Sequence, residues 1–125
     1  ICGSGLILVI DDEFLIRQTY KDMLTECGYN VMLAEDGFQG VDLYIEHKNQ
    51  ISLVILDMAM PKKSGIETYK ELKIINPDIK VLMASGFRQD ERVIQSLQMG
   101  VNRFLQKPFT VNTLSQNIDI ILKNK

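Results

Sequence analysis

The chain has 125 residues, 46% of them hydrophobic and 24% charged, with a formal net charge of −2 at pH 7. This length predicts one globular domain, and the composition is ordinary for such a domain. The slightly acidic balance gives no electrostatic reason to expect direct nucleic-acid binding. No apolar run approaches the roughly 18 residues of a membrane span, so we expect no membrane insertion of this segment.

The first residues and the two cysteines indicate where the domain begins and where it resides. Residues 1–5, ICGSG, are small and flexible, so we expect a linker or leader there and a folded domain over 6–125. This leader is neither basic enough nor long enough for a secretory signal. Cys2 and Cys27 have no metal-binding spacing, and Cys27 falls on the apolar side of a predicted helix. A buried, reduced thiol in the cytoplasm is therefore expected.

Two strand–helix units are predicted in the first part of the chain. LILVI at 6–10 is a continuous apolar run, which is typical of a strand buried on both faces. Apolar residues spaced three and four apart then predict a helix over 13–27, capped by Gly28. NVMLA at 30–34 predicts the second strand. A helix should follow to about residue 48, with these side chains inward: Val41, Tyr44 and Ile45.

Three more units are predicted in the rest of the chain. The most apolar run, ISLVIL at 51–56, predicts a central third strand, and a helix is expected over 65–75, ended by Asn76-Pro77. The remaining predicted elements are strands at 79–84 and 102–106, a short helix over 89–98, and a last helix capped by Thr110. Strands that alternate with helices predict a parallel sheet with helices on both faces, and such sheets bind ligands beyond the carboxyl ends of their strands.

Reactive side chains follow four of the five predicted strands. Asp11 and Asp12 follow the first strand and Asp57 the third; Ser85 follows the fourth and Lys107 the fifth. Each has an alternative explanation when taken alone: the acids could cap a helix, the serine could form a turn and the lysine could lie on the surface.

Taken together, these residues favour phosphoryl chemistry. Converging carboxylates repel one another, and a hard divalent cation such as Mg²⁺ relieves that repulsion through oxygen ligands. With a cation, an ammonium and a hydroxyl around it, Asp57 would be a nucleophile that forms an aspartyl phosphate. The neighbouring Lys62 and Lys63 are predicted to form a solvated turn, with steering of an acidic or phosphorylated partner as the alternative.

Four segments in register resemble a known family. They are LILVIDDE at 6–13, VILDMAMPKKSG at 54–65, ASG at 84–86 and FLQKPF at 104–109. The sequence looks like a response-regulator receiver domain of bacterial two-component signalling. The resemblance implies a doubly wound, flavodoxin-like α/β fold with a five-stranded parallel sheet in the order 2-1-3-4-5.

The resemblance also implies residue roles. Asp57 would be the phosphoacceptor, and Mg²⁺ would be bound by Asp12, Asp57 and the backbone carbonyl of Ala59, with Asp11 acting through water. Lys107 would pair with the phosphoryl group. Ser85 would donate to a phosphoryl oxygen, and Phe104 would be the switch aromatic. The peptide bond before Pro108 is usually cis in the family.

Other features of the resemblance concern partners and lifetime. A histidine kinase or a histidine phosphotransfer domain would supply the phosphoryl group, and the chain itself would not be an enzyme acting on separate substrates. FLQKPF and the glycine-bearing leader are similar to receivers of hybrid sensor histidine kinases, with a single-domain regulator as the alternative. Asn102 and Arg103 stand where DNA-binding regulators often have acids, so we expect a monomer. The apolar Ala59 and Phe87 beside the phosphoryl position predict slow self-dephosphorylation.

Two other functions compete with this one. A Mg²⁺-dependent phosphatase or phosphotransferase with an aspartyl phosphate usually has a second acid two residues after the nucleophile, where this chain has Ala59. A degenerate receiver that acts only as a binding module would not need the complete set of Asp12, Asp57, Ser85 and Lys107.

Overall fold

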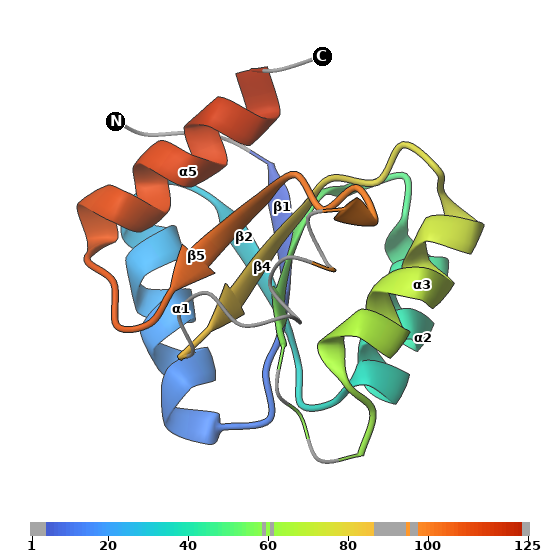
Figure 1. The fold of residues 1–125 in the computed structure, drawn as a ribbon. Helices are drawn as coiled ribbons and strands as arrows, with labels where there is room; N and C mark the ends of the chain where they lie inside the picture. The colour runs from blue at the N-terminus through green and yellow to red at the C-terminus, as the bar shows by residue number, and fades with distance from the viewer. Residues whose placement is uncertain (1–4, 59, 61, 87–94, 96–97, 124–125) are drawn as a thin grey trace.

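The fold of the chain is a five-stranded parallel sheet between two layers of helices (Figure 1). The computed structural model describes residues 5–58, 60, 62–86, 95 and 98–123. The strands are β1 (Leu6–Ile10), β2 (Asn30–Ala34), β3 (Ile51–Asp57), β4 (Val81–Ser85) and β5 (Arg103–Gln106). Their order is β2-β1-β3-β4-β5, so the predicted order is confirmed and β3 is central.

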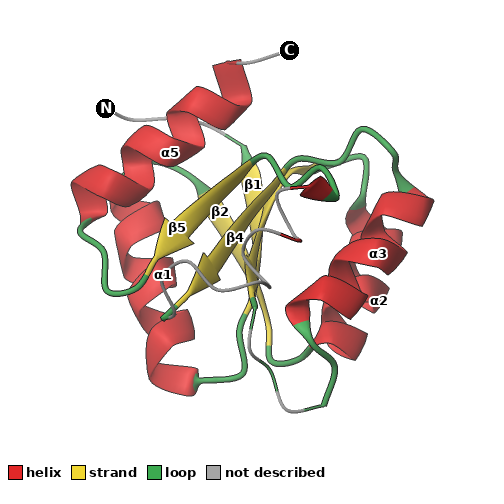
Figure 2. Ribbon diagram, in the orientation of Figure 1, coloured by secondary structure: helices red, strands yellow, loops and turns green. Residues whose placement is uncertain are grey.

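Four helices cover the sheet in the described part of the chain. They are α1 (Phe14–Glu26), α2 (Gly37–His47), α3 (Gly65–Ile75) and α5 (Val111–Lys123). Figure 2 shows α1 and α5 on one face of the strands and α2 and α3 on the other. The predicted helix over 89–98 falls mostly outside the described residues, as do most of the expected leader at 1–5 and the last two residues.

Local chemistry explains where these helices begin and end. Ser64 and Glu67 form a reciprocal capping box at the start of α3, and Asp36 accepts the Gln39 N–H at the start of α2. The Thr110 hydroxyl oxygen accepts the Thr113 N–H, as predicted for the cap of α5. Gly28 follows α1 with a φ of +94°, a conformation in which glycine has no steric penalty.

Two hydrophobic cores lie on the two faces of the sheet. One packs β-strand residues against Tyr44 of α2 and Leu72 of α3, and the other packs them against Leu24 of α1 and Ile118 of α5. Four residues of β1 and five of β3 are buried, which is the pattern of parallel strands covered on both faces.

Some sequence predictions about the core are wrong in detail. Ile45, predicted to point inward, is 57% exposed, while Val41 and Tyr44 are buried as predicted. Cys27 is half-buried at the end of α1 instead of fully buried. β4 begins at Val81, two residues later than predicted. None of the helices in the described ranges combines the length and apolar character needed to cross a lipid bilayer.

Candidate functional site

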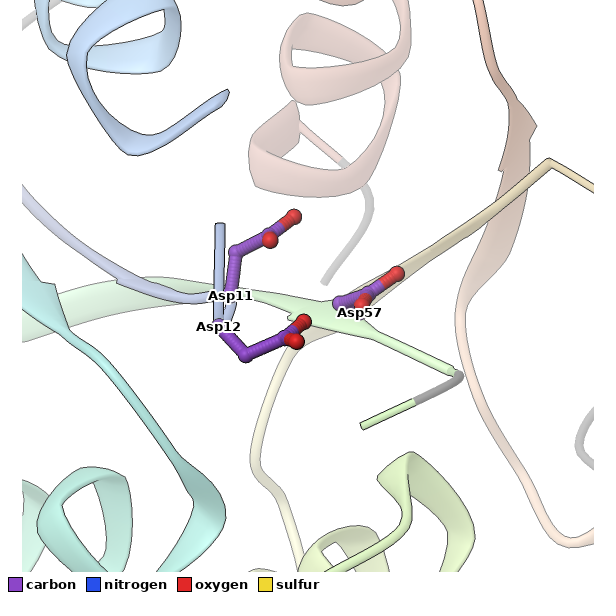
Figure 3. A group of neighbouring side chains, drawn as sticks. All are labelled: Asp11, Asp12 and Asp57. Atoms are coloured by element: carbon purple, nitrogen blue, oxygen red, sulfur yellow. The ribbon is translucent and has the colours of Figure 1, made fainter. Parts of the chain in front are cut away.

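The carboxyl ends of β1 and β3 bring three aspartates together. Asp11 and Asp12 directly follow β1, and Asp57 is the last residue of its neighbour β3. Figure 3 shows the three side chains at these adjacent strand ends, with the Asp12 carboxylate directed toward Asp57. One carboxylate oxygen from each residue lies within 4.8 Å of the others. The predicted convergence of acids at one edge of the sheet is therefore confirmed.

Lys107 completes the cluster from the end of β5. Its ammonium donates hydrogen bonds to Asp11 Oδ2 at 2.9 Å and to Asp57 Oδ1 at 3.0 Å. The backbone fixes this position, because the Lys107 N–H donates to the carbonyl of Ser85 at 2.7 Å. The peptide bond to Pro108 is cis, as the resemblance implied. Lys107 therefore bridges two buried carboxylates.

Most of this cluster is withdrawn from water. Asp11 is 1% exposed and Asp57 is 5% exposed. The Asp11 Oδ1 atom also accepts the backbone N–H of Glu13 at the start of α1. The alternative in which these acids cap the first helix is wrong, because the N-cap of α1 is Glu13 and no side chain makes a capping hydrogen bond there. The two oxygens of Asp11 instead accept from the Glu13 N–H and from Lys107.

The electrostatics of the cluster depend on burial and on like charges. Burial chiefly raises the pKa of Asp57 from 3.8 to about 6; the charges of Asp11 and Asp12 add to this rise, and Lys107 opposes it. Burial would lower the pKa of the Lys107 ammonium, but the charges and hydrogen bonds of Asp57 and Asp11 outweigh it and raise that pKa. Burial and the two neighbouring acids thus outweigh the one ammonium beside Asp57, and its carboxylate is held less favourably than in water.

The donor set fits a hard divalent cation. It consists of carboxylate oxygens alone. The charges of Asp11 and Asp12, which add to the effect of burial on the Asp57 pKa, are charges that a cation would offset. The backbone carbonyl of Ala59, which the resemblance added to this set, lies outside the described residues.

The two predicted switch residues lie on the neighbouring strands β4 and β5. Ser85, the last residue of β4, is 1% exposed, and its neighbour across the sheet is Gln106, directly before Lys107. Phe104 of β5 is half-buried and packs against the core that faces α2 and α3. Phe87, the second of the predicted flanking apolar residues, lies outside the described residues.

Lys63 has a role that the sequence did not indicate. The predicted solvated turn is correct for Lys62, which is exposed and lies 3.7 Å from Asp36 Oδ2, but Lys63 is only 8% exposed. The Lys63 ammonium forms an ion pair with Glu71 of α3 and lies 4.7 Å from the centre of the Phe38 ring of α2. The sequence does not distinguish these two adjacent lysines. Lys63 is buried because its partners lie on α2 and α3, and such contacts between separate elements cannot be read from the sequence.

Comparison with known proteins defines the class to which this fold and site correspond. Residues 7–119 match the family described as the response regulator receiver domain. The chain is 36% identical over 114 residues to the chemotaxis protein CheY of Bacillus subtilis. The alignment covers 90% of this chain and 93% of that protein. It is 34% identical over 117 residues to the transcriptional regulatory protein CpxR of Escherichia coli, covering 94% of this chain but only 49% of that protein.

Solved structures agree with these sequence matches. A response regulator receiver domain protein from Clostridium thermocellum superposes with a TM-score of 0.91 at 35% identity, covering 95% of this chain and 94% of that one. CheY in the CheX-CheY-BeF3-Mg²⁺ complex from Borrelia burgdorferi superposes with a TM-score of 0.89 at 26% identity, covering 94% and 88% of the two chains. The chain belongs to the response regulator receiver family, and it is a receiver domain of two-component signal transduction.

Proposed function

We propose that Asp57 accepts a phosphoryl group from a phosphohistidine on a histidine kinase or a histidine phosphotransfer domain. The observation that carries this proposal is the convergence of Asp11, Asp12 and Asp57 with the Lys107 ammonium at one edge of the sheet. Only Asp57 of the three acids ends the central strand, where it pairs with Ala84 of β4 and directly follows Leu56, the partner of Ile10 in β1.

The transfer uses this geometry directly. An Asp57 carboxylate oxygen attacks phosphorus, the bond from phosphorus to the histidine nitrogen breaks, and that nitrogen keeps the electron pair and takes up a proton. Lys107 moves from its present carboxylate partners toward the phosphoryl oxygens, and the Ser85 hydroxyl donates to another of them. The burial of Asp57 and Asp11 limits the access of water to the reacting carboxylate while these charges are rearranged.

Mg²⁺ is the cofactor that the site suits. Asp12 and Asp57 would bind it directly, and Asp11 would do so through water, with the Ala59 carbonyl as a further ligand. When bound by these residues, Mg²⁺ would supply positive charge that stabilises the phosphoryl oxygens. The three aspartates together support this assignment, because without a cation Asp57 is held with a raised pKa.

The output is a change of conformation. With Ser85 drawn to the phosphoryl group, Phe104 turns inward toward the space that the loop after β4 vacates, and the edge of the sheet formed by β4 and β5 changes shape. The chain then controls a partner or an attached domain. It catalyses its own modification and turns over no separate substrate, so it is not an enzyme in the usual sense.

The biological setting follows from the same reasoning. We propose a cytoplasmic, monomeric receiver that makes no direct contact with nucleic acid. A hybrid sensor histidine kinase is the proposed parent protein, and a single-domain regulator is the alternative.

Intact mass measurement tests the phosphoacceptor. The protein is incubated with acetyl phosphate and Mg²⁺, and a gain of one phosphoryl group is expected in the wild type but not in Asp57→Asn. Turnover of acetyl phosphate with release of product far faster than the phosphorylated form decays would instead indicate a phosphotransferase or phosphatase. A protein that stays unmodified, with no beryllofluoride binding, would indicate a degenerate receiver.

The phosphorylated form should decay slowly. Ala59 and Phe87 carry no group that could orient an attacking water molecule. A phosphate-release assay is expected to show a lifetime of minutes or longer, shortened in Ala59→Asn. Loss of phosphate within seconds in the wild type would contradict this expectation.

A further inference from the structure

The side chain of Arg17 turns back from the first turn of α1 to the segment that follows β1. Its guanidinium Nη1 donates a hydrogen bond to the backbone carbonyl oxygen of Asp11 at 2.8 Å. The same guanidinium lies 5.8 Å from the centre of the Phe14 ring. Arg17 is half-buried, so water competes less for this hydrogen bond than it would at an exposed position. The contact joins α1 to the segment that carries two of the three clustered acids.

The carbonyl that Arg17 contacts belongs to the peptide group between Asp11 and Asp12. A peptide group is planar, so it turns as one unit about the backbone bonds on either side of it. A hydrogen bond to its oxygen therefore fixes the plane from which the Asp12 backbone continues. The N–H of Asp11 is fixed as well, because it donates to the carbonyl of Ala34 in β2 at 3.1 Å. The backbone at Asp11 is thus held at both its N–H and its carbonyl.

The Asp12 carboxylate depends on this backbone for its direction. The Asp11 side chain has partners of its own in the Glu13 N–H and Lys107. In the part of the chain that the structure describes, the Asp12 carboxylate has no hydrogen bond or ion pair. Figure 3 nevertheless shows it directed toward Asp57, and the three acids offer oxygens within 4.8 Å of one another. The position of the Asp12 carboxylate is therefore set by the backbone that leads to it.

The charge of Arg17 and its hydrogen bond would affect a bound cation in opposite ways. A guanidinium close to a metal site repels the cation, so its removal would strengthen Mg²⁺ binding if charge alone mattered. A hydrogen bond that holds a ligand in place has the reverse effect, because a mobile ligand loses conformational freedom when it binds the metal. Residues that orient metal ligands without touching the metal typically change its affinity by about 10- to 100-fold. The sign of the change thus distinguishes position from charge.

We propose that Arg17 is a positioning residue for Mg²⁺, which keeps the Asp12 carboxylate directed toward Asp57 by holding the peptide group before Asp12. This inference rests on the proposed binding of Mg²⁺ by Asp12 and Asp57. In this role Arg17 touches neither the cation nor the phosphoryl group and acts through the backbone. Its loss changes the metal-free protein more than the metal-bound protein, in which the cation itself holds Asp12.

The Arg17→Met variant tests this role, because it keeps the apolar stem of the side chain and removes the guanidinium. Isotopically labelled protein is titrated with magnesium chloride, and the amide chemical shifts measured by NMR give the dissociation constant of Mg²⁺. We expect this constant to be about tenfold higher in Arg17→Met than in the wild type. Before Mg²⁺ is added, the amide signals of Asp12 and Glu13 should be shifted or broadened in the variant. At saturating Mg²⁺ they should approach those of the wild type.

The matched control is Arg103→Met. The Arg103 guanidinium also donates a hydrogen bond, from Nε to Asn117 Oδ1 at 2.6 Å. Arg103 begins β5, at the opposite end of that strand from Lys107. The control removes the same charge without touching the segment after β1, so it should leave the Mg²⁺ dissociation constant and the Asp12 amide signal unchanged. Dispersed amide spectra verify that both variants are folded.

Each outcome decides the inference. An unchanged or lower Mg²⁺ dissociation constant in Arg17→Met would overturn it and would show that position does not outweigh charge. A higher constant with unchanged Asp12 and Glu13 amide signals in the metal-free variant would overturn it as well. If the wild type does not bind Mg²⁺, the proposed cofactor fails and the role of Arg17 fails with it. If the wild type binds Mg²⁺ and Arg17→Met binds it equally well, only the role of Arg17 fails.

Discussion

Replacing Asp57 with asparagine keeps the size and shape of the side chain and removes its charge. The pKa of Asp57 is raised to about 6, chiefly by burial and further by the charges of Asp11 and Asp12, from an ordinary value of 3.8. Because the raised pKa means that the folded protein prefers the neutral form, the ionised side chain destabilises the metal-free protein. Asp57→Asn is therefore expected to stabilise that protein at neutral pH.

The sign of the pH dependence follows from proton linkage. Below pH 3.8 the side chain is protonated in both the folded and the unfolded protein, and its contribution to stability is fully present. Between pH 3.8 and about 6 only the folded protein keeps the proton, so stability falls as pH rises. Above that range the loss is complete. The stability difference between Asp57→Asn and the wild type should grow over the same interval and then stay constant.

The magnitude comes from the distance between the two pKa values. A difference of about two pH units corresponds to about 3 kcal/mol, since one unit is about 1.4 kcal/mol. Water reaches the rim of the site, where the Lys107 side chain is 18% exposed, and it screens part of this energy. We expect Asp57→Asn to be more stable by about 1.5 kcal/mol at pH 7 after this discount.

Urea unfolding followed by far-ultraviolet circular dichroism measures the difference, since the chain has no tryptophan. Both proteins are compared in EDTA from about pH 3.5 to about pH 8, so that the other titrating groups cancel in the subtraction. A difference that does not vary with pH, or a less stable Asp57→Asn at pH 7, would refute the electrostatic reasoning. In millimolar Mg²⁺ the stability difference between Asp57→Asn and the wild type should become smaller or change sign. The cation stabilises the wild type by offsetting the Asp57 charge, which the variant lacks.

Three further substitutions are expected to change the free energy of unfolding. Lys107→Ala should lose about 2–3 kcal/mol at pH 7 because it leaves two buried carboxylates without their shared donor, and Mg²⁺ should restore part of the loss. Gly65→Ala should lower the free energy of unfolding by about 2–3 kcal/mol, because its new Cβ would lie 2.5 Å from a backbone carbonyl oxygen at the end of β3. Gly86→Ala is the control and should be nearly neutral, because its new Cβ would have nothing within 4 Å. Lys63→Ala should lose about 2 kcal/mol and Lys62→Ala less than about 0.5 kcal/mol, because only the first side chain is buried. Thermal and urea unfolding measure all of these, and equal effects within the glycine pair or within the adjacent lysine pair would contradict the packing argument.

The sheet and its functional edge could be predicted because their signals are local. An apolar run that ends in an acid marks both a buried strand and the residue at its carboxyl end, so the sequence alone predicts Asp12, Asp57 and Lys107 at one edge. The strand order itself came from the family resemblance, since alternation of strands and helices alone does not fix the neighbours of each strand.

What the sequence could not predict depends on contacts between distant elements. Ile45 continues the apolar pattern of α2 but faces solvent, because the helix packs on the sheet through Val41 and Tyr44. Tyr20 is buried on α1, but nothing in the sequence indicates that its hydroxyl has no hydrogen-bond partner among the described residues. A hydrogen bond that is missing is a property of three-dimensional packing alone.

The two walls of the phosphoryl site are held by different contacts. On one side Lys63 joins the segment after Asp57 to α2 and α3 through an ion pair and an aromatic contact. On the other side Lys107 reaches the acids from the edge strand β5. We therefore expect phosphorylation, which would take Lys107 from its present partners, to change the β4–β5 edge more than the α2–α3 layer, because Lys63 keeps its contacts with both of those helices.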